Sequence, residues 1–124
     1  MKKSKMRIVN IADLRPKYFS PHGGNNKVMM KFALSTLKDK GRKSNWNFFG
    51  YAEFPIGATA GWHKHERTDE WFYILDGKAE VIIDKERRSL KKGDVVLTKS
   101  GSYHDIVNVT QKLVFLAIEI ETKK

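Results

Sequence analysis

The chain has 124 residues, no cysteine and a formal net charge of +10. Its length suits a single domain with a substantial core, and the lack of cysteine excludes disulfides, thiolate metal sites and thiol nucleophiles. No stretch approaches the roughly 18 apolar residues that a membrane-spanning helix needs, and no apolar secretory segment follows the charged first residues. We therefore expect a cytoplasmic protein with no membrane partner.

Residues 1–26 are the least strand-like part of the chain. Ile8 to Leu14 could form a short strand or a turn of helix. Arg15-Pro16 interrupts either one, because the residue before a proline disfavours helical geometry. Residues 20–26, SPHGGNN, form a loop by composition. We interpret His22 in this loop as an exposed side chain rather than a ligand contact.

Two strands are expected between this loop and Pro55. Residues 27–37, KVMMKFALSTL, could be helix or strand; their short length, the branched Val28 and the flanking glycines and asparagines favour a strand. Residues 38–45 form a polar connecting loop. In residues 46–54 aromatic side chains alternate onto both faces, as in a strand that is covered on both sides.

The second half of the chain contains several short strands separated by turn residues. Asp76-Gly77 is typical of a tight hairpin, so we predict that residues 78–84 pair back there onto residues 70–75. Another turn is expected at residues 84–88, and the remaining strands are expected at residues 95–98, 105–109 and 113–120. Because no 12-residue segment has a clean helical period, the sequence predicts a single all-β domain, either a sandwich or a barrel.

The stretch from Gly57 to Gly77 contains the first candidate site. His63 and His65 are two residues apart, so in an extended strand their side chains project from the same face. Two imidazoles side by side suit a transition-metal ion. Glu70, at the start of the aromatic strand that follows, adds a carboxylate.

A second group of residues adds a third imidazole. Gly93 precedes the strand expected at residues 95–98, Lys99 to Gly101 form a turn, and His104 and Asn108 follow. A single histidine in a strand is more often a packed side chain than a ligand, but three of the 4 histidines fall in these two groups. Three imidazoles and a carboxylate suit divalent Mn, Fe, Co, Ni, Cu or Zn. Asn108 is expected to steady the turn or strand.

Together the two groups resemble the motifs of the cupin family. The first cupin motif is glycine, five residues, His-x-His, three or four residues, glutamate, six residues and glycine, and residues 57–77 match every fixed position. The second motif matches at Gly93, Gly101, His104 and Asn108, with Lys99 where the family has proline. The resemblance covers residues 45–120.

This resemblance implies a cupin jelly-roll β-barrel over residues 27–124. It also implies a homodimer, and an N-terminal arm over residues 1–26 that packs on the barrel or on a partner subunit. The ligands it implies for one divalent metal are His63, His65, Glu70 and His104. Four protein ligands around a six-coordinate ion would leave two positions for water, oxygen or a chelating substrate, whereas structural zinc sites are usually closed and four-coordinate.

Side chains next to these ligands are candidates for a small-molecule pocket. By strand alternation Phe72 and Ile74 share the face of Glu70, and Ile106 shares that of His104. These side chains would make a mostly apolar cavity above a polar metal. Tyr51 could add a hydroxyl group, although its face cannot be related to that of the histidines. Core packing is the more usual role for each of the four.

Three functions are compatible with the sequence. The first is a metal-dependent enzyme, such as a dioxygenase, decarboxylase, isomerase or lyase, acting on a small oxygen-rich molecule. The second is a non-catalytic, metal-bearing module that binds a small ligand. The third is nucleic-acid binding through the positive charge, which gathers at residues 2–7, 38–43, 85–92 and 123–124. Clusters of positive charge like these are usually solvated surface, or they could attract an anionic ligand. Because no nucleic-acid-binding motif accompanies them, we do not expect a nucleic-acid partner.

Overall fold

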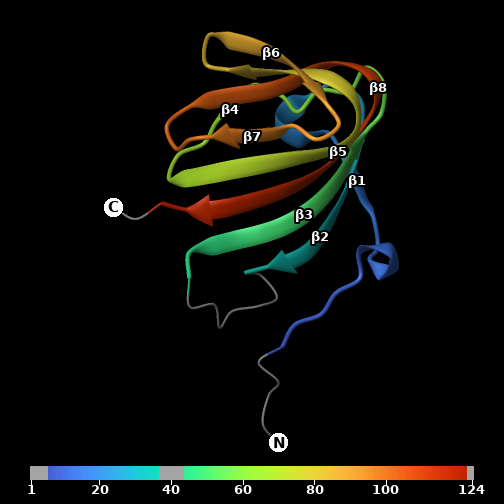
Figure 1. The fold of residues 1–124 in the computed structure, drawn as a ribbon, viewed down its shortest axis with the longest axis vertical. Helices are drawn as coiled ribbons and strands as arrows, with labels where there is room; N and C mark the ends of the chain where they lie inside the picture. Colours follow the sequence, from blue (N-terminus) through green and yellow to red (C-terminus); the bar gives the residue numbers. More distant parts are fainter. Residues whose placement is uncertain (1–5, 37–43, 123–124) are drawn as a thin grey trace, which may run out of the picture.

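The computed structural model describes residues 6–36 and 44–122, and β-strands dominate it (Figure 1). The strands in chain order are β1 (Lys17–Phe19), β2 (Val28–Ser35), β3 (Trp46–Phe54), β4 (His63–Lys64), β5 (Thr68–Ile83), β6 (Glu86–Lys91), β7 (Val95–Thr98) and β8 (Tyr103–Glu121). The expected all-β class is confirmed. The loop expected at residues 38–45 lies outside the described residues except for its last two positions.

The long strands β5 and β8 form the frame of the fold. Hydrogen bonds connect the strands in the order β1-β2-β3-β8-β5-β6, while β4 pairs with the beginning of β8 and β7 with the first half of β5. Because β5 and β8 bend, each contributes to two sheets (Figure 1). This is the jelly-roll arrangement that the sequence predicts.

The two sheets differ in size. The larger sheet consists of β1, β2, β3 and β7 with residues 68–76 of β5 and 113–121 of β8. The smaller sheet consists of β4 and β6 with residues 78–83 of β5 and 103–107 of β8.

The bend in β5 corrects the hairpin predicted at Asp76-Gly77. The strand does not turn back there but continues to Ile83, with its register shifted on both sides of Asp76. Gly77 has a φ of +95°, and a Cβ at this position would lie 2.1 Å from the carbonyl oxygen of Lys112 on β8. Glycine is needed here because two backbones cross closely. The hairpin forms instead at residues 84–85, inside the turn expected there.

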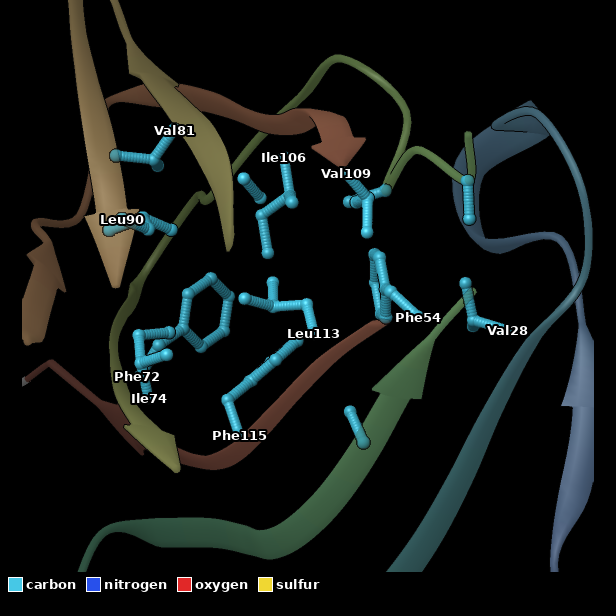
Figure 2. Close-up of a cluster of buried hydrophobic side chains, with 14 of the residues drawn as sticks. Val28, Phe54, Phe72, Ile74, Val81, Leu90, Ile106, Val109, Leu113 and Phe115 are labelled. Atoms are coloured by element: carbon cyan, nitrogen blue, oxygen red, sulfur yellow. The ribbon is translucent and has the colours of Figure 1, made fainter. Parts of the chain in front are cut away.

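The hydrophobic core lies between the two sheets (Figure 2). From the larger sheet come the rings of Phe54, Phe72 and Phe115, with the centroid of Phe115 5.3 Å from that of Phe54 and 4.7 Å from that of Phe72. From the smaller sheet come aliphatic side chains, among them Val81 and Leu90, both 4% exposed. The larger sheet therefore contributes the bulky aromatic part of the core.

The N-terminal segment packs against the rest of the chain through backbone contacts. Residues 8–14 contain a short 3-10 helix, η1 (Ile11–Asp13), which agrees with the helical alternative for this stretch. Strand β1 pairs with β2 and leads into a second 3-10 helix, η2 (Pro21–Gly23). Asn25 and Thr59 then form two hydrogen bonds, from Asn25 N–H to Thr59 Oγ1 (2.7 Å) and from Thr59 N–H to Asn25 O (3.0 Å). No helix within residues 6–36 or 44–122 is long and apolar enough to cross a membrane.

Candidate metal centre

Strand β4 places two of the predicted imidazoles side by side. His63 on β4 is the register partner of His104 on β8, and their Nε2 atoms are 2.9 Å apart. His65 follows directly after β4, with its Nε2 3.2 Å from that of His63 and 2.8 Å from that of His104. Three ring nitrogens therefore converge on one point.

The turn of the second motif holds His65 in place. The backbone N–H of His65 donates to the carbonyl of Ser102 (3.0 Å), and its carbonyl accepts from the N–H of Gly101 (2.6 Å). Gly101 has a φ of +90°, a conformation that favours glycine. Ser102 N–H closes the turn onto the carbonyl of Lys99 (3.1 Å), so lysine at this position is compatible with the turn.

Glu70 adds a carboxylate from the larger sheet. Its Oε1 lies 3.1 Å from Nε2 of His65 and 3.5 Å from Nε2 of His104. The residue is only 8% exposed. The structure thus brings together all four residues that were expected to bind a metal.

The second nitrogen of each imidazole has its own partner. Nδ1 of His63 lies 2.7 Å from the carbonyl oxygen of Gly61, which can only accept, so Nδ1 carries the proton. Nδ1 of His65 contacts the hydroxyl of Thr68 (2.9 Å), and Nδ1 of His104 contacts that of Thr98 (2.8 Å). Partners of this kind fix the ring orientation of metal-binding histidines and leave the Nε2 lone pairs free for the ion.

The spacing of these atoms fits one first-row divalent ion. Two nitrogens at right angles around an ion about 2.1 Å from each would be about 3.0 Å apart, and the three Nε2–Nε2 distances are 2.8, 2.9 and 3.2 Å. Three imidazoles and a carboxylate are also donors that such ions accept. The donor set and its spacing therefore fit a metal of the expected class.

The pKa values of two of these imidazoles reflect burial and the neighbouring charges. Burial, followed by the charges of His65 and His63, lowers the pKa of His104 to about 3, so this ring is neutral near pH 7. Burial acts to lower the pKa of His65 too, but the hydrogen bond and charge of Glu70 raise it overall. A cation at the Nε2 of His65 would take the place of that proton.

A cavity of about 450 Å³ opens beside these four side chains. Phe72 and Ile106, both expected in a pocket, line it. The Phe72 ring stacks beside that of His104, with the centroids 5.7 Å apart and the planes 20° from parallel. The apolar wall therefore begins directly at the imidazoles.

Two other residues expected in the pocket lie elsewhere. Ile74 is fully buried among the core side chains rather than at the cavity surface. Tyr51 lies on the outer face of β3, because its neighbours Gly50 and Ala52 take the buried positions. Its hydroxyl donates to Glu53 (2.6 Å), and burial together with this hydrogen bond raises the pKa of Tyr51 to about 12.

His22 lies much closer to the site than the composition of its loop suggested. Its ring stacks on that of His63, with the centroids 3.6 Å apart and the planes 11° from parallel, and it lines the cavity. Its backbone is left-handed (φ +47°), an uncommon conformation for a residue other than glycine. Gly61 leaves room for it, since a Cβ there would lie 2.5 Å from the carbonyl oxygen of His22. No sequence spacing indicates this contact between distant segments.

Glu119 is a second carboxylate at the cavity that sequence reasoning missed. Its Oε1 lies 3.6 Å from Nδ1 of His65, and its Oε2 accepts from Nδ2 of Asn47 (3.2 Å). Burial raises the pKa of Glu119. The sequence could have indicated this position by strand alternation. Residues 113, 115 and 117 of β8 are buried in turn, and Glu119 continues the same inward phase.

Comparison with known proteins gives consistent similarities. A family model described as the cupin domain matches residues 50–120. The chain is 33% identical to an oxalate-binding protein of Thermotoga maritima, over 97% of this chain and 98% of the relative. It is also 33% identical to the pectin degradation protein KdgF of Dickeya dadantii, over 51% of this chain and 57% of the relative.

Among solved structures, a predicted oxalate decarboxylase from Thermotoga maritima is similar throughout. The match has a TM-score of 0.83 and 32% identity, and covers 92% of this chain and 98% of the other. The similarity therefore extends over most of the chain, and the cupin-domain match at residues 50–120 contains His63, His65, Glu70 and His104.

Proposed function

This chain belongs to the cupin family, and we propose that it is a metal-dependent enzyme acting on a small carboxylic acid. One divalent transition metal would be held by His63, His65, Glu70 and His104. The observation that carries the proposal is the convergence of three Nε2 atoms within 3.2 Å, each on a ring whose other nitrogen has a partner. The oxalate-binding relative supports a carboxylate ligand.

A divalent ion bound here would supply Lewis acidity toward an oxygen of the ligand. Glu70 would cancel one of its two charges and the neutral imidazoles none, so the ion with these four side chains would carry a net charge of about +1, which favours an anion. Glu119 lines the same cavity, and burial, which raises the pKa of this carboxyl, favours its neutral form. Gly61, Thr68 and Thr98 keep the rings oriented. The phenyl ring of Phe72 beside His104 lowers the polarity next to the imidazoles, which strengthens electrostatic interactions there.

The test begins with elemental analysis of the purified protein and of a His63→Ala/His104→Ala variant. We expect close to one metal ion per wild-type chain and loss of that metal in the variant. His22→Ala is the matched control, since it removes an adjacent imidazole whose nitrogens are outside the cluster, and it should keep the metal. Equal metal content in the wild type and the double variant would contradict the site.

Turnover is tested on the metal-loaded protein with carboxylic acids, oxalate first, under aerobic and anaerobic conditions. Product formation that disappears in His63→Ala, while the circular dichroism spectrum is unchanged, is the expected result. Turnover that survives this substitution would contradict the proposal.

A non-catalytic binding module is the second candidate, favoured by the name of the oxalate-binding relative. It requires saturable, metal-dependent binding of a carboxylic acid with no product under either atmosphere. The same titrations and product assays therefore separate the two candidates.

We also propose a homodimer formed through the outer face of the larger sheet. Tyr73 and Val95 are paired across β5 and β7 and are 46% and 65% exposed, and Leu97 beside them is 38% exposed. An apolar patch on an edge strand is a surface that favours association. Light scattering should show a dimer that the Leu97→Arg substitution dissociates. The control, Ile56→Arg at an exposed loop position, should leave the dimer intact. A monomeric wild type would contradict the proposed dimer.

A further inference from the structure

Phenylalanine rings form much of the apolar wall of the cavity beside the four clustered side chains. Six of the chain's 7 phenylalanines line it, and the exception is Phe49. The six are Phe19, Phe32, Phe48, Phe54, Phe72 and Phe115. They come from β1, β2, β3, β5 and β8, so every strand of the larger sheet except the edge strand β7 contributes at least one ring.

The rings form a continuous path away from the imidazoles. Phe72 stacks beside His104, Phe115 contacts Phe72 at 4.7 Å, and Phe54 contacts Phe115 at 5.3 Å between centroids. Phe32 and Phe48 form a further edge-to-face pair in the same wall, with centroids 5.3 Å apart. A molecule anchored at His63, His65, Glu70 and His104 would therefore meet apolar surface on the phenylalanine side of the cavity, while Lys64, Glu66 and Glu119 line other parts of it.

The size of the cavity does not suit oxalate alone. Its volume of about 450 Å³ falls within the roughly 300–1,000 Å³ of pockets that hold drug-sized molecules. An oxalate dianion consists of two carboxylates and nothing else, so it would leave most of this space to water against phenyl rings. Apolar surface gains free energy only when water leaves it.

We propose that the ligand of this site is a carboxylic acid with an aromatic or similarly bulky apolar body. This rests on the proposed function, because the carboxylate is taken to bind at the centre formed by His63, His65, Glu70 and His104. The body would lie among the phenylalanines of the larger sheet. Each buried methylene contributes about 0.8 kcal/mol, or roughly fourfold in Kd, so a phenyl group in place of a methyl group should strengthen binding at least tenfold.

Two acids with the same head group test this preference. Mandelate and lactate are both 2-hydroxy acids and differ in a phenyl against a methyl group. In calorimetric titrations of the metal-loaded protein, we expect mandelate to bind at least tenfold more tightly than lactate, and more tightly than oxalate. Lactate or oxalate binding as tightly as mandelate would overturn the inference and leave the proposed function standing. Absence of binding by all three acids would overturn both.

Neighbouring residues on β3 provide a matched pair of variants. Phe48 lines the cavity, whereas Phe49, the next residue, does not. Phe48→Ala should lower the ratio of lactate Kd to mandelate Kd at least threefold, and Phe49→Ala should leave it unchanged. The ratio is unaffected by stability alone, because both acids are measured on the same folded sample. Phe48→Leu, which keeps an apolar side chain, serves if Phe48→Ala does not fold. A ratio unchanged by the Phe48 substitution would overturn the inference.

Discussion

The smaller and larger sheets share two long strands but present different side chains to the space between them. The smaller sheet brings His63 and His104 together through the pairing of β4 with β8, and fills its inner face with aliphatic residues such as Val81 and Leu90. The larger sheet contributes Glu70 and most of the aromatic wall of the cavity.

The outer faces of the two sheets also differ in polarity. The larger sheet exposes apolar side chains such as Val95 and Leu97 on the edge strand β7. The smaller sheet ends in β6, where Arg87 and Arg88 form exposed ion pairs with Glu80 and Glu86. A metal bound by His63, His65, Glu70 and His104 would therefore need both sheets packed together, whereas the proposed dimer would use the outer face of the larger sheet only.

The crossing of β5 and β8 is where this arrangement can be broken most severely. Gly77→Ala would place a Cβ 2.1 Å from the Lys112 carbonyl at a φ of +95°, and we expect it to reduce the free energy of unfolding by about 3 kcal/mol or more. Gly93→Ala is the control, because Gly93 has a φ of +93° but a Cβ there would meet no atom within 4 Å. Its cost should be roughly 1–2 kcal/mol in urea unfolding. Equal costs would show that the crossing is not tight.

The aliphatic part of the core, contributed by the smaller sheet, can be weakened without changing the four clustered side chains. Leu90 on β6 is 4% exposed and does not line the cavity. Leu90→Ala should lower the free energy of unfolding by about 2–5 kcal/mol, because it leaves a void between the sheets. Ile82→Ala, at a partly exposed position in the same sheet, should cost less. Metal content of the folded protein should be unchanged in both variants, and loss of metal from Leu90→Ala would contradict the separation of core and site.

The contact between Thr98 on β7 and His104 on β8 tests how the larger sheet supports the imidazoles of the smaller one. Thr98→Val keeps the shape of this buried side chain but removes the hydroxyl 2.8 Å from Nδ1 of His104. Loss of such a partner typically lowers metal affinity about 10–100-fold, measurable by competition with a chelator. Thr110→Val, at an exposed position on β8, should leave the affinity unchanged. An affinity for Thr98→Val within twofold of wild type would mean that the ring is oriented by packing alone.

The sequence predicted what depends on short-range spacing. His63 and His65 are two residues apart, so strand alternation relates their side chains directly, and Glu70 follows five residues later at the spacing of the cupin motif. The hairpin predicted at Gly77 is wrong because an Asp-Gly pair can occur in a tight turn or in a bent strand, and the pair alone does not distinguish the two. What requires glycine here is the nearby carbonyl of Lys112 on β8, which the local sequence does not reveal.

Positions that depend on contacts between distant segments could not be predicted. The face of Tyr51 could not be related to the histidines across residues 55–61, and the structure places it on the outer face of β3. The stacking of His22 on His63 depends on the room left by Gly61, which no spacing reveals.

The smallest expected effect lies at the smaller sheet, away from the cavity lining. The hydrogen bond from Asn108, with help from Arg87, holds the pKa of Glu80 below its usual 4.5. The native state thus releases this proton more readily than the unfolded chain, so the stabilisation is present above pH 4.5 and is lost as the pH falls through the lowered pKa. Asn108→Gly removes the amide but suits the φ of +50°, and in an NMR titration it should raise the pKa of Glu80 more than Arg87→Ala does. A larger rise of the Glu80 pKa in Arg87→Ala would show that charge, rather than the Asn108 hydrogen bond, sets this pKa. Metal affinity should be unchanged in either variant, because neither side chain lines the cavity.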